Sequence, residues 1–199
     1  MEIRSFLAFE LPEQIKKILS GVLTDMRQAP TDIKWVRPEN IHLTVIFLGN
    51  MEVKLIEDMG GIVKGVCSRF LPFSMSLKSA GVFSSRRNPR VLWIGLVGDI
   101  DRMGEFRDTL QRDLSPFGIK EEKRRFSPHL TLGRFKKGSK SGVQLDDLLL
   151  KYAGLESPLV TLNELVLFKS ELTPKGAIYS RLDAWPLVGD TKTLTKKET

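Results

Sequence analysis

The stretches PENIHLTVIFLG (residues 38–49) and SPHLTLGRF (residues 127–135) contain the only two histidines of this 199-residue chain. His42 and His129 each open the same tripeptide, His-Leu-Thr, and they lie 87 residues apart. Each tripeptide lies in an apolar run of strand length, so we predict strands at 42–48 and 129–135. Because the spacing is close to half of the chain, the repeat indicates an internal duplication.

The other apolar and polar patterns follow this duplication coarsely. Before each His-Leu-Thr strand we expect a strand and a helix, and after it a helix and further strands. The expected strands are at 3–10, 73–83, 90–97, 159–169 and 177–184, with a short one in TDIKWVRPEN (residues 31–40). The expected helices are at 12–28, 52–70, 101–114 and near 143–152. This order predicts an α+β fold with two lobes, each presenting one His-Leu-Thr strand.

Composition is typical of one folded, soluble domain, with 41% hydrophobic residues. We expect this domain to cover residues 1–186 and the polar end at 187–199 to be a flexible tail. The apolar runs fall short of the roughly 20 residues that a membrane span needs, and the N-terminus lacks a secretory signal pattern. The single cysteine, Cys67, is expected to be buried on a helix and is typical of a reducing compartment, so we predict a cytoplasmic protein.

The net charge of +7 is concentrated around the second motif. Between Lys120 and Lys140 the chain has eight lysines and arginines against two glutamates. A charge run alone usually marks a solvated face. This run surrounds His129, however, and therefore favours an anionic substrate.

Alternation along a strand gives the two motifs a shared geometry. His42 and Thr44 point to one face of their strand, as do His129 and Thr131, while the leucine between them points to the core. Two imidazoles on one cleft suit phosphoryl transfer, because a pKa near 6.5 allows one to be protonated while the other is neutral. One would take a proton from an attacking water, and the other would protonate the leaving oxygen. The hydroxyls would hold the non-bridging oxygens.

Two arginines near His129 are candidates for binding phosphate oxygens. Arg134 lies five residues after His129, an odd offset that places it on the opposite face of a regular strand. It can reach the site only through a bulge or the end of the strand. Arg125 lies four residues before His129, at the matching parity, but Pro128 separates the two.

The sequence contains no motif for a zinc site or for a site that binds a nucleoside triphosphate or a dinucleotide. Zinc usually takes three or four His, Cys or carboxylate ligands, and the sequence has neither an HExxH motif nor a cysteine pair. It also has no GxxxxGK[ST] loop and no GxGxxG after a strand. We therefore expect no metal and no cofactor.

The paired His-x-Thr motifs resemble those of the 2H phosphoesterase superfamily. They are most similar to its RNA 2′,3′-cyclic phosphodiesterase branch, also called the 2′-5′ RNA ligase family. The stretches that carry the resemblance are RSFLAFELP (4–12), WVRPENIHLTVIFLG (35–49), FSPHLTLGRF (126–135) and LFKSELTPKGAIYSRL (167–182). They span nearly the whole chain and show no departure at the catalytic positions.

The resemblance implies two pseudo-symmetric antiparallel sheets facing a central cleft, with the helices outside. It implies metal-independent hydrolysis of a terminal 2′,3′-cyclic phosphate on RNA to a 2′-phosphate. His42 would be the proton donor to the leaving 3′-oxygen, His129 the proton acceptor that activates water, and Thr44 and Thr131 the phosphate-binding hydroxyls. It also implies a reversible 2′-5′ RNA ligase activity, in which a 5′-hydroxyl takes the place of water.

Two other functions stay open at this point. The same site could act on a small cyclic phosphate, although such a substrate needs no extended cationic groove. The chain could also be a non-catalytic RNA-binding module, although a binder needs no pair of proton-transfer groups. RNA with a cyclic phosphate end is the expected partner. No obligate protein partner is expected, and a monomer is sufficient because one chain holds both motifs.

Aromatic residues near the motifs could in principle stack on RNA bases. We expect each of them in the core instead: Phe9, Trp35, Phe47, Phe126 and Phe135.

Overall fold

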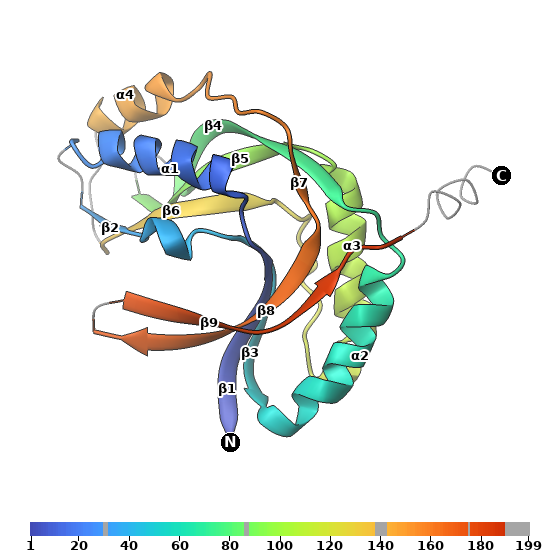
Figure 1. Cartoon of the computed structure of the whole chain (residues 1–199). Helices are drawn as coiled ribbons and strands as arrows, with labels where there is room; N and C mark the ends of the chain where they lie inside the picture. Colours follow the sequence, from blue (N-terminus) through green and yellow to red (C-terminus); the bar gives the residue numbers. More distant parts are fainter. Residues whose placement is uncertain (30–31, 86–87, 138–142, 175, 190–199) are drawn as a thin grey trace.

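The computed structural model describes residues 1–29, 32–85, 88–137, 143–174 and 176–189, and their strands form two antiparallel sheets (Figure 1). Sheet A has the order β3-β1-β8-β9, and sheet B has the order β2-β6-β5-β4-β7. The strands of sheet A are β1 (Glu2–Phe9), β3 (Leu43–Glu52), β8 (Glu164–Thr173) and β9 (Gly176–Pro186). Those of sheet B are β2 (Ile33–Trp35), β4 (Phe73–Ser85), β5 (Asn88–Gly98), β6 (His129–Phe135) and β7 (Val160–Leu162). The helices are α1 (Glu13–Met26), α2 (Ile56–Cys67), α3 (Ile100–Asp113) and α4 (Val143–Lys151).

The predicted α+β class with two antiparallel sheets is confirmed, and each His-Leu-Thr strand belongs to a different sheet. In sheet A, β1 lies between β3 and β8; in sheet B, β5 lies between β6 and β4. The two sheets therefore repeat one pattern of three strands. In sheet A this pattern joins the two halves of the chain, since β8 pairs with β1. This pairing ties the end of the chain to its beginning.

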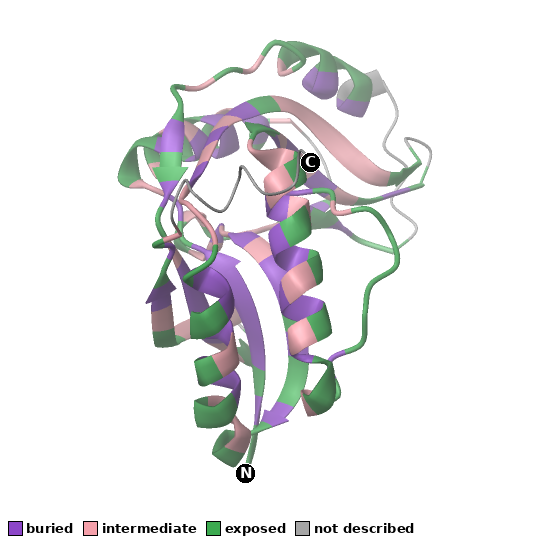
Figure 2. Cartoon of the chain, turned by 90° about the vertical axis from the view of Figure 1, so that its right-hand side faces the viewer, coloured by how far each residue is buried: buried purple, intermediate pink, exposed green. Residues whose placement is uncertain are grey.

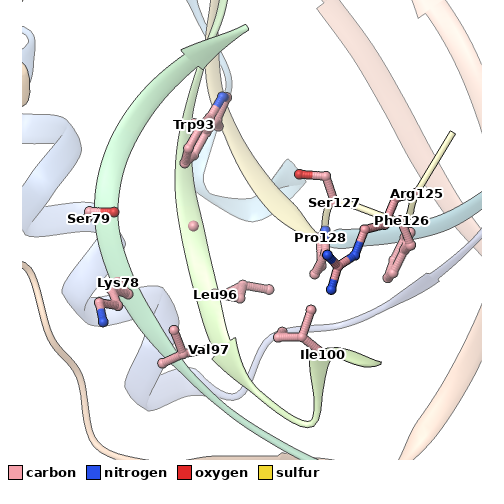
Figure 3. Close-up of a pocket in the computed structure, with 11 residues that line it drawn as sticks. Lys78, Ser79, Trp93, Leu96, Val97, Ile100, Arg125, Phe126, Ser127 and Pro128 are labelled. Carbon is pink, nitrogen blue, oxygen red and sulfur yellow. The ribbon is translucent and has the colours of Figure 1, made fainter. Parts of the chain in front are cut away.

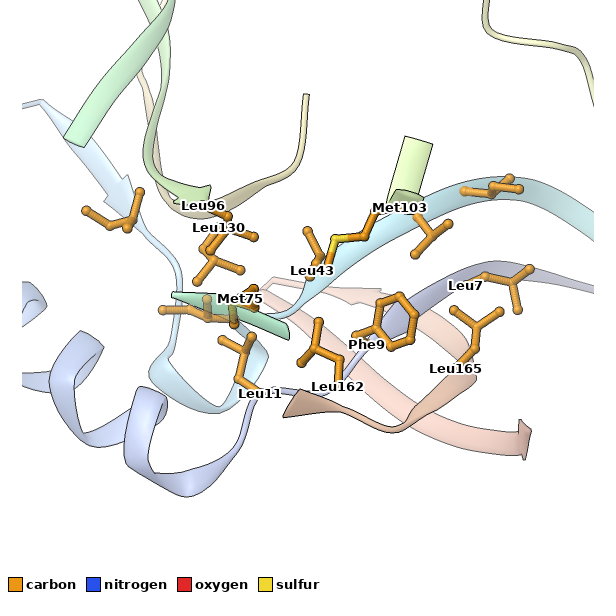
Figure 4. Packing of buried hydrophobic residues seen from close by; sticks show 14 of the residues in the cluster. Leu7, Phe9, Leu11, Leu43, Met75, Leu96, Met103, Leu130, Leu162 and Leu165 are labelled. Atoms are coloured by element: carbon orange, nitrogen blue, oxygen red, sulfur yellow. The ribbon is translucent and has the colours of Figure 1, made fainter. Parts of the chain in front are cut away.

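The hydrophobic core lies between the sheets and the helices that cover them. The helices present a buried side to the sheets and an exposed side to solvent (Figure 2). Leu43 and Leu130, the central residues of the two tripeptides, are both fully buried, as strand alternation predicts. Both lie in the same cluster with Phe9, Met75 and Met103 (Figure 4). Burial of each leucine contributes about 1.5–3 kcal/mol and anchors its motif in the core.

At two places the bounds of the expected elements differ clearly from those of the structure. The helix expected at 52–70 begins only at Ile56, because β3 continues to Glu52 in register with Glu2 and a short 3₁₀ turn, η2 (Val53–Leu55), follows. The strand expected at 159–169 is divided at Asn163 into β7 and β8, which belong to different sheets. In both places pairing with a distant strand sets the boundary, and local apolar pattern does not record such pairing.

The end of the described chain packs against the body of the protein. Leu187 is buried and its N–H donates to the carbonyl of Asn163, at 2.7 Å. The N–H of Gly189 donates to the carbonyl of Phe70, at 3.0 Å. Of the tail predicted at 187–199, residues 190–199 lie outside the described residues.

Cys67 is fully buried on α2, as predicted, and burial raises the pKa of its thiol to about 12. The thiol is therefore protonated and unreactive at neutral pH. Among the described helices, none is both long and apolar enough to cross a membrane.

Candidate active site

His42 lies where the chain leaves a 3₁₀ turn and enters β3. Its Nδ1 is 2.8 Å from the carbonyl oxygen of Asn40. An Nδ1–H that donates to this carbonyl leaves Nε2 available to a substrate. The ring stacks on Phe6 at 4.7 Å between centroids and meets Tyr179 edge-on at 5.2 Å. Asn40 also donates through Nδ2 to the carbonyl of Ala177 in β9, at 2.8 Å, and so ties the turn to the strand that carries Tyr179.

His129 repeats this arrangement at the start of β6. Its Nδ1 is 2.8 Å from the carbonyl oxygen of Ser127, again two residues earlier. Phe83 of β4 meets its ring edge-on, at 4.6 Å between centroids. No hydrogen bond to Nε2 of either histidine occurs within the part of the chain that the structure describes. Both imidazoles are thus oriented by the backbone and present the same nitrogen to the site.

A β-bulge in β6 brings Arg134 onto the face of His129. In the pairing with β5, Trp93 lies opposite Thr131 and Leu92 lies opposite Gly133, so Leu132 is the extra residue. The bulge reverses the alternation after Thr131, and exposed Arg134 therefore shares the face of the motif. Gly133 leaves room for the neighbouring strand β2 at the bulge, because a Cβ there would lie 2.3 Å from Ile33 Cγ2.

A matching bulge in β3 brings Phe47 onto the face of His42. Ala8 lies opposite Thr44 and Leu7 lies opposite Ile46, so Val45 is the extra residue. Phe47 is 66% exposed, at 6.2 Å between centroids from Phe6. The prediction that it lies in the core is wrong, because the bulge reverses its side of the strand.

The other aromatic residues near the motifs have less exposed positions. Phe9 and Phe135 are buried as predicted, and Trp35 and Phe126 are partly buried against the core.

Charge interactions link the two motif faces across the sheets. Arg134 of sheet B lies near enough to His129 to lower the pKa of its imidazole. Burial raises the pKa of Tyr179 on sheet A. The guanidinium of Arg134 and that of Arg4 of β1 both act to lower this pKa. Tyr179 in turn contacts His42. Both histidines therefore lie around one cationic region, in which Arg4 and Arg134 supply the charge and Tyr179 contacts His42.

The hydroxyls of the motifs are available at this region. Thr44 and Thr131 are half-buried, and their side chains make no hydrogen bond within the described ranges. Arg134 likewise has no ion pair among those residues, although its register partner in β2 is another cation, Lys34. Unpaired donors of this kind are suited to the oxygens of a bound phosphate.

Arg125 lies in the segment before β6 and not on a motif strand. It is paired with Asp101 at 3.0 Å, with both side chains highly exposed, and it lines a pocket beside Ser127 and Pro128. Part of the basic run is neutralised in a similar way, by Glu122 on Arg124 and by Asp32 on Lys136. Lys140, at the end of the run, lies outside the described residues.

Arg107 organises the loop in front of His129, a role that the sequence did not indicate. This buried side chain donates to the carbonyls of Glu122 and Arg124, at 3.3 and 3.1 Å. Its guanidinium lies over the ring of Phe126, at 5.3 Å. Three contacts along residues 122–126 hold the segment that leads to Ser127, whose carbonyl orients His129.

Burial lowers the pKa of both imidazoles below the ordinary value near 6.5, and Arg134 lowers that of His129 further. The hydrogen bonds to the Asn40 and Ser127 carbonyls act in the opposite direction, more weakly. We expect both histidines to titrate below pH 6.5 in an NMR titration of the free protein, which is simple to assign because the chain has only two.

Arg134→Gln is the matched variant for this titration. Loss of a positive charge favours the imidazolium, so the titration of His129 should move to higher pH while that of His42 stays in place. No shift of the His129 signal, or a larger shift of the His42 signal than of the His129 signal, would contradict the placement of Arg134.

The described residues contain no group of three or more His, Cys, Asp or Glu side chains placed to hold a metal ion.

Comparisons with known proteins agree with this geometry. The family model of LigT-like phosphoesterases matches the chain twice in succession, at residues 9–93 and 94–179. The double match supports the internal duplication, because each match contains one His-Leu-Thr motif. The chain is 31% identical over 187 residues to the RNA 2′,3′-cyclic phosphodiesterase of Methanothermobacter thermautotrophicus, covering 94% of this chain and 100% of the relative. It is 32% identical over 183 residues to the RNA 2′,3′-cyclic phosphodiesterase of Thermotoga maritima, covering 90% of this chain and 93% of the relative.

Solved structures show the same fold. A crystal structure of a protein from Thermus thermophilus superposes with a TM-score of 0.77 at 24% identity, covering 94% of this chain and 100% of the other. E. coli LigT complexed with 3′-AMP superposes with a TM-score of 0.70 at 21% identity, covering 94% of this chain and 99% of the other.

Proposed function

The chain belongs to the LigT-like phosphoesterase family, and from this premise we propose that it hydrolyses the terminal 2′,3′-cyclic phosphate of RNA to a 2′-phosphate. One observation carries the proposal: two imidazoles, each held at Nδ1 by a carbonyl two residues earlier, present Nε2 around a shared cationic region. Pairs of this kind supply an acid and a base to a single displacement at phosphorus.

In the proposed reaction His129 is the base and His42 the acid. Neutral His129 keeps its proton on Nδ1, toward Ser127, so Nε2 can take a proton from water as the water oxygen bonds to phosphorus. The bond from phosphorus to O3′ breaks in line with this attack. Burial disfavours the protonated form of His42 in the free protein, and a bound anionic phosphate beside the ring favours it. Protonated His42 then gives its Nε2 proton to O3′, and the phosphate stays on O2′. Hydrolysis relieves the strain of the five-membered ring and needs no further reactant.

The remaining residues hold the phosphate and the terminal nucleoside. Thr44, Thr131 and Arg134 donate to the non-bridging oxygens, where negative charge increases in the transition state. Phe47 offers an exposed ring to the terminal base on the His42 side, where the leaving oxygen and its ribose lie. The partner is thus an RNA end, and a monomer is sufficient because one chain supplies every group. The single buried cysteine is consistent with a cytoplasmic location.

The product of a short RNA ending in a 2′,3′-cyclic phosphate tests this function. We expect the purified protein to convert it to a 2′-phosphate in the presence of a metal chelator, as followed by phosphorus NMR. A 3′-phosphate would mean that the acid assists the opposite oxygen. RNA binding without turnover would instead favour a binding module, and faster turnover of a cyclic mononucleotide than of the RNA would favour a small-molecule phosphodiesterase.

A further inference from the structure

The two halves of the site differ at one matched position. His42 and His129 are followed five residues later by Phe47 and Arg134, and a bulge turns both of these side chains onto the motif face. The His129 half thus adds a guanidinium to its threonine. The motif strand of the His42 half adds a ring that cannot donate a hydrogen bond.

Each imidazole meets one aromatic ring edge-on. Tyr179 of β9 lies 5.2 Å from His42 between centroids, at an interplanar angle of 85°. Phe83 of β4 lies 4.6 Å from His129, at 89°. A phenylalanine makes this contact beside His129, so the contact itself needs no hydroxyl. Packing against His42 therefore does not account for the hydroxyl of Tyr179.

The hydroxyl of Tyr179 is open to a ligand. Tyr179 is half-buried, and its hydroxyl makes no hydrogen bond with any residue that the structure describes. The oxygen is not among the fully buried polar atoms that lack a partner, so it keeps access to solvent. Burial raises the pKa of Tyr179, and the group therefore stays protonated at neutral pH and can donate a hydrogen bond.

Two cations face this hydroxyl from the two sheets. Arg4 of β1 and Arg134 of β6 both lie near enough to act on its pKa. Neither arginine has an ion pair among the described residues. A guanidinium has no acceptor for the hydroxyl proton. The group that fits between these three donors is therefore an anion, next to the imidazole that Tyr179 contacts.

Open space lies beside the other imidazole. A pocket of about 410 Å³ is lined there by Trp93, Arg125 and Ser127, which Figure 3 shows around it. Gly95, which also lines the pocket, is the register partner of His129. The volume far exceeds the roughly 30 Å³ of one water molecule. Water thus has access on the side of the base, and the Tyr179 hydroxyl lies on the side of the acid.

We propose that the Tyr179 hydroxyl donates a hydrogen bond to a non-bridging oxygen of the cyclic phosphate and stabilises the negative charge that increases on this oxygen in the transition state; this rests on the proposed function. Tyr179 then supplies on sheet A the donor that Arg134 supplies on sheet B. It is a catalytic residue that lies outside both His-Leu-Thr motifs. The hydroxyl keeps its proton throughout, so the transfers at the two histidines are unchanged.

Tyr179→Phe removes the hydroxyl and keeps the ring against His42. We expect kcat for a cyclic-phosphate RNA to fall by about ten- to hundredfold, somewhat less than for a sole oxyanion donor because other donors remain. KM should stay within about threefold, since the contact strengthens in the transition state. The unfolding temperature should stay that of the wild type, because the hydroxyl has no partner among the described residues of the free protein.

Tyr152→Phe is the matched control, since the chain has only two tyrosines. The Tyr152 hydroxyl donates to Asp25 of α1, away from the motif strands. Its loss should lower the unfolding temperature and leave kcat within about twofold, the reverse of the result for Tyr179→Phe.

Sulfur in place of a non-bridging oxygen tests where the hydroxyl binds. A cyclic phosphorothioate end has two forms, Rp and Sp, with sulfur at one or the other position. Sulfur is the weaker hydrogen-bond acceptor. The wild type should therefore hydrolyse one form more slowly because its sulfur faces Tyr179, and Tyr179→Phe should lose most of that penalty. The penalty for the other form should stay unchanged.

The outcomes separate this inference from the function it rests on. A normal kcat in Tyr179→Phe, a loss confined to KM, or unchanged sulfur penalties for both forms would overturn the role of Tyr179. So would a loss of rate matched by a shift in the NMR titration of His42, because the hydroxyl would then act through the imidazole. A wild-type protein that does not hydrolyse the RNA would refute the proposed function itself.

Discussion

His129→Ala and His42→Ala are each expected to lower kcat/KM for a cyclic-phosphate RNA by about 10²–10⁴-fold, the usual contribution of a positioned acid or base. The two groups act in one step, so the double variant should lose little more than the worse single variant. Steady-state kinetics on the three proteins measure this directly. Near-normal turnover in either single variant would contradict acid–base catalysis.

The pH dependence of kcat/KM in each single variant distinguishes the role of the base from that of the acid. If His129 is the base, His129→Ala loses the fall in kcat/KM toward low pH, since no imidazole must then be deprotonated. If His42 is the acid, His42→Ala loses the fall toward high pH. Exchange of these two results would reverse the assignment and place the nucleophile on the His42 side.

A matched variant separates catalysis from packing. His42 stacks on Phe6 and contacts Tyr179, so its removal leaves a gap in this ring cluster. His42→Phe keeps an aromatic ring but cannot carry a proton. We expect it to be as inactive as His42→Ala and to unfold at a temperature close to that of the wild type. Activity in His42→Phe would mean that the ring, and not its proton, is what the reaction needs.

Regular alternation explains which parts of the site can be predicted from the sequence. His42, Thr44, His129 and Thr131 precede any bulge, so a period of two places each pair on one face. The apolar runs then put the intervening leucines in the core. These inferences use only a few consecutive residues, and the structure agrees with them at Leu43 and Leu130.

The bulges explain why Phe47 and Arg134 are harder to place from the sequence than the histidines and threonines. Phe47 and Arg134 both lie five residues after their histidines, at the parity of the opposite face. An extra residue, Val45 or Leu132, reverses that parity. Gly133 is the signal that could have indicated the second bulge, since glycine inside a strand often marks one. No such glycine occurs at Val45 or Ile46, so the sequence carries no signal of the first bulge.

Contacts between distant segments could not be predicted from local pattern. Tyr179 lies 137 residues after His42, and the pairing of β8 with β1 brings its strand to the site. Arg107 reads as one more charged residue of an amphipathic helix, although it is buried beneath the loop at 122–126. In both cases the partner is specified by the tertiary fold alone.

Arg134→Ala is expected to lower kcat/KM by about 10²–10³-fold, the effect of removing one oxyanion donor. The bulge directs this guanidinium to the face of His129, and no carboxylate among the described residues neutralises it. It is therefore free to bind the phosphate oxygens as their charge increases. The loss should appear mainly in kcat, because an interaction that strengthens in the transition state contributes little to substrate binding.

Arg134→Lys and Lys34→Ala give this prediction its controls. A lysine keeps the charge but not the two-pronged geometry of the guanidinium, so it should restore only part of the rate. Lys34 is the register partner of Arg134 on β2, one strand farther from His129, and its removal changes the local charge by the same amount as Arg134→Ala. We expect Lys34→Ala to change kcat by less than about threefold, since exposed charges act weakly at a distance. Equal losses in Lys34→Ala and Arg134→Ala would mean that general electrostatic attraction of RNA, and not a contact at the phosphate, accounts for the role of Arg134.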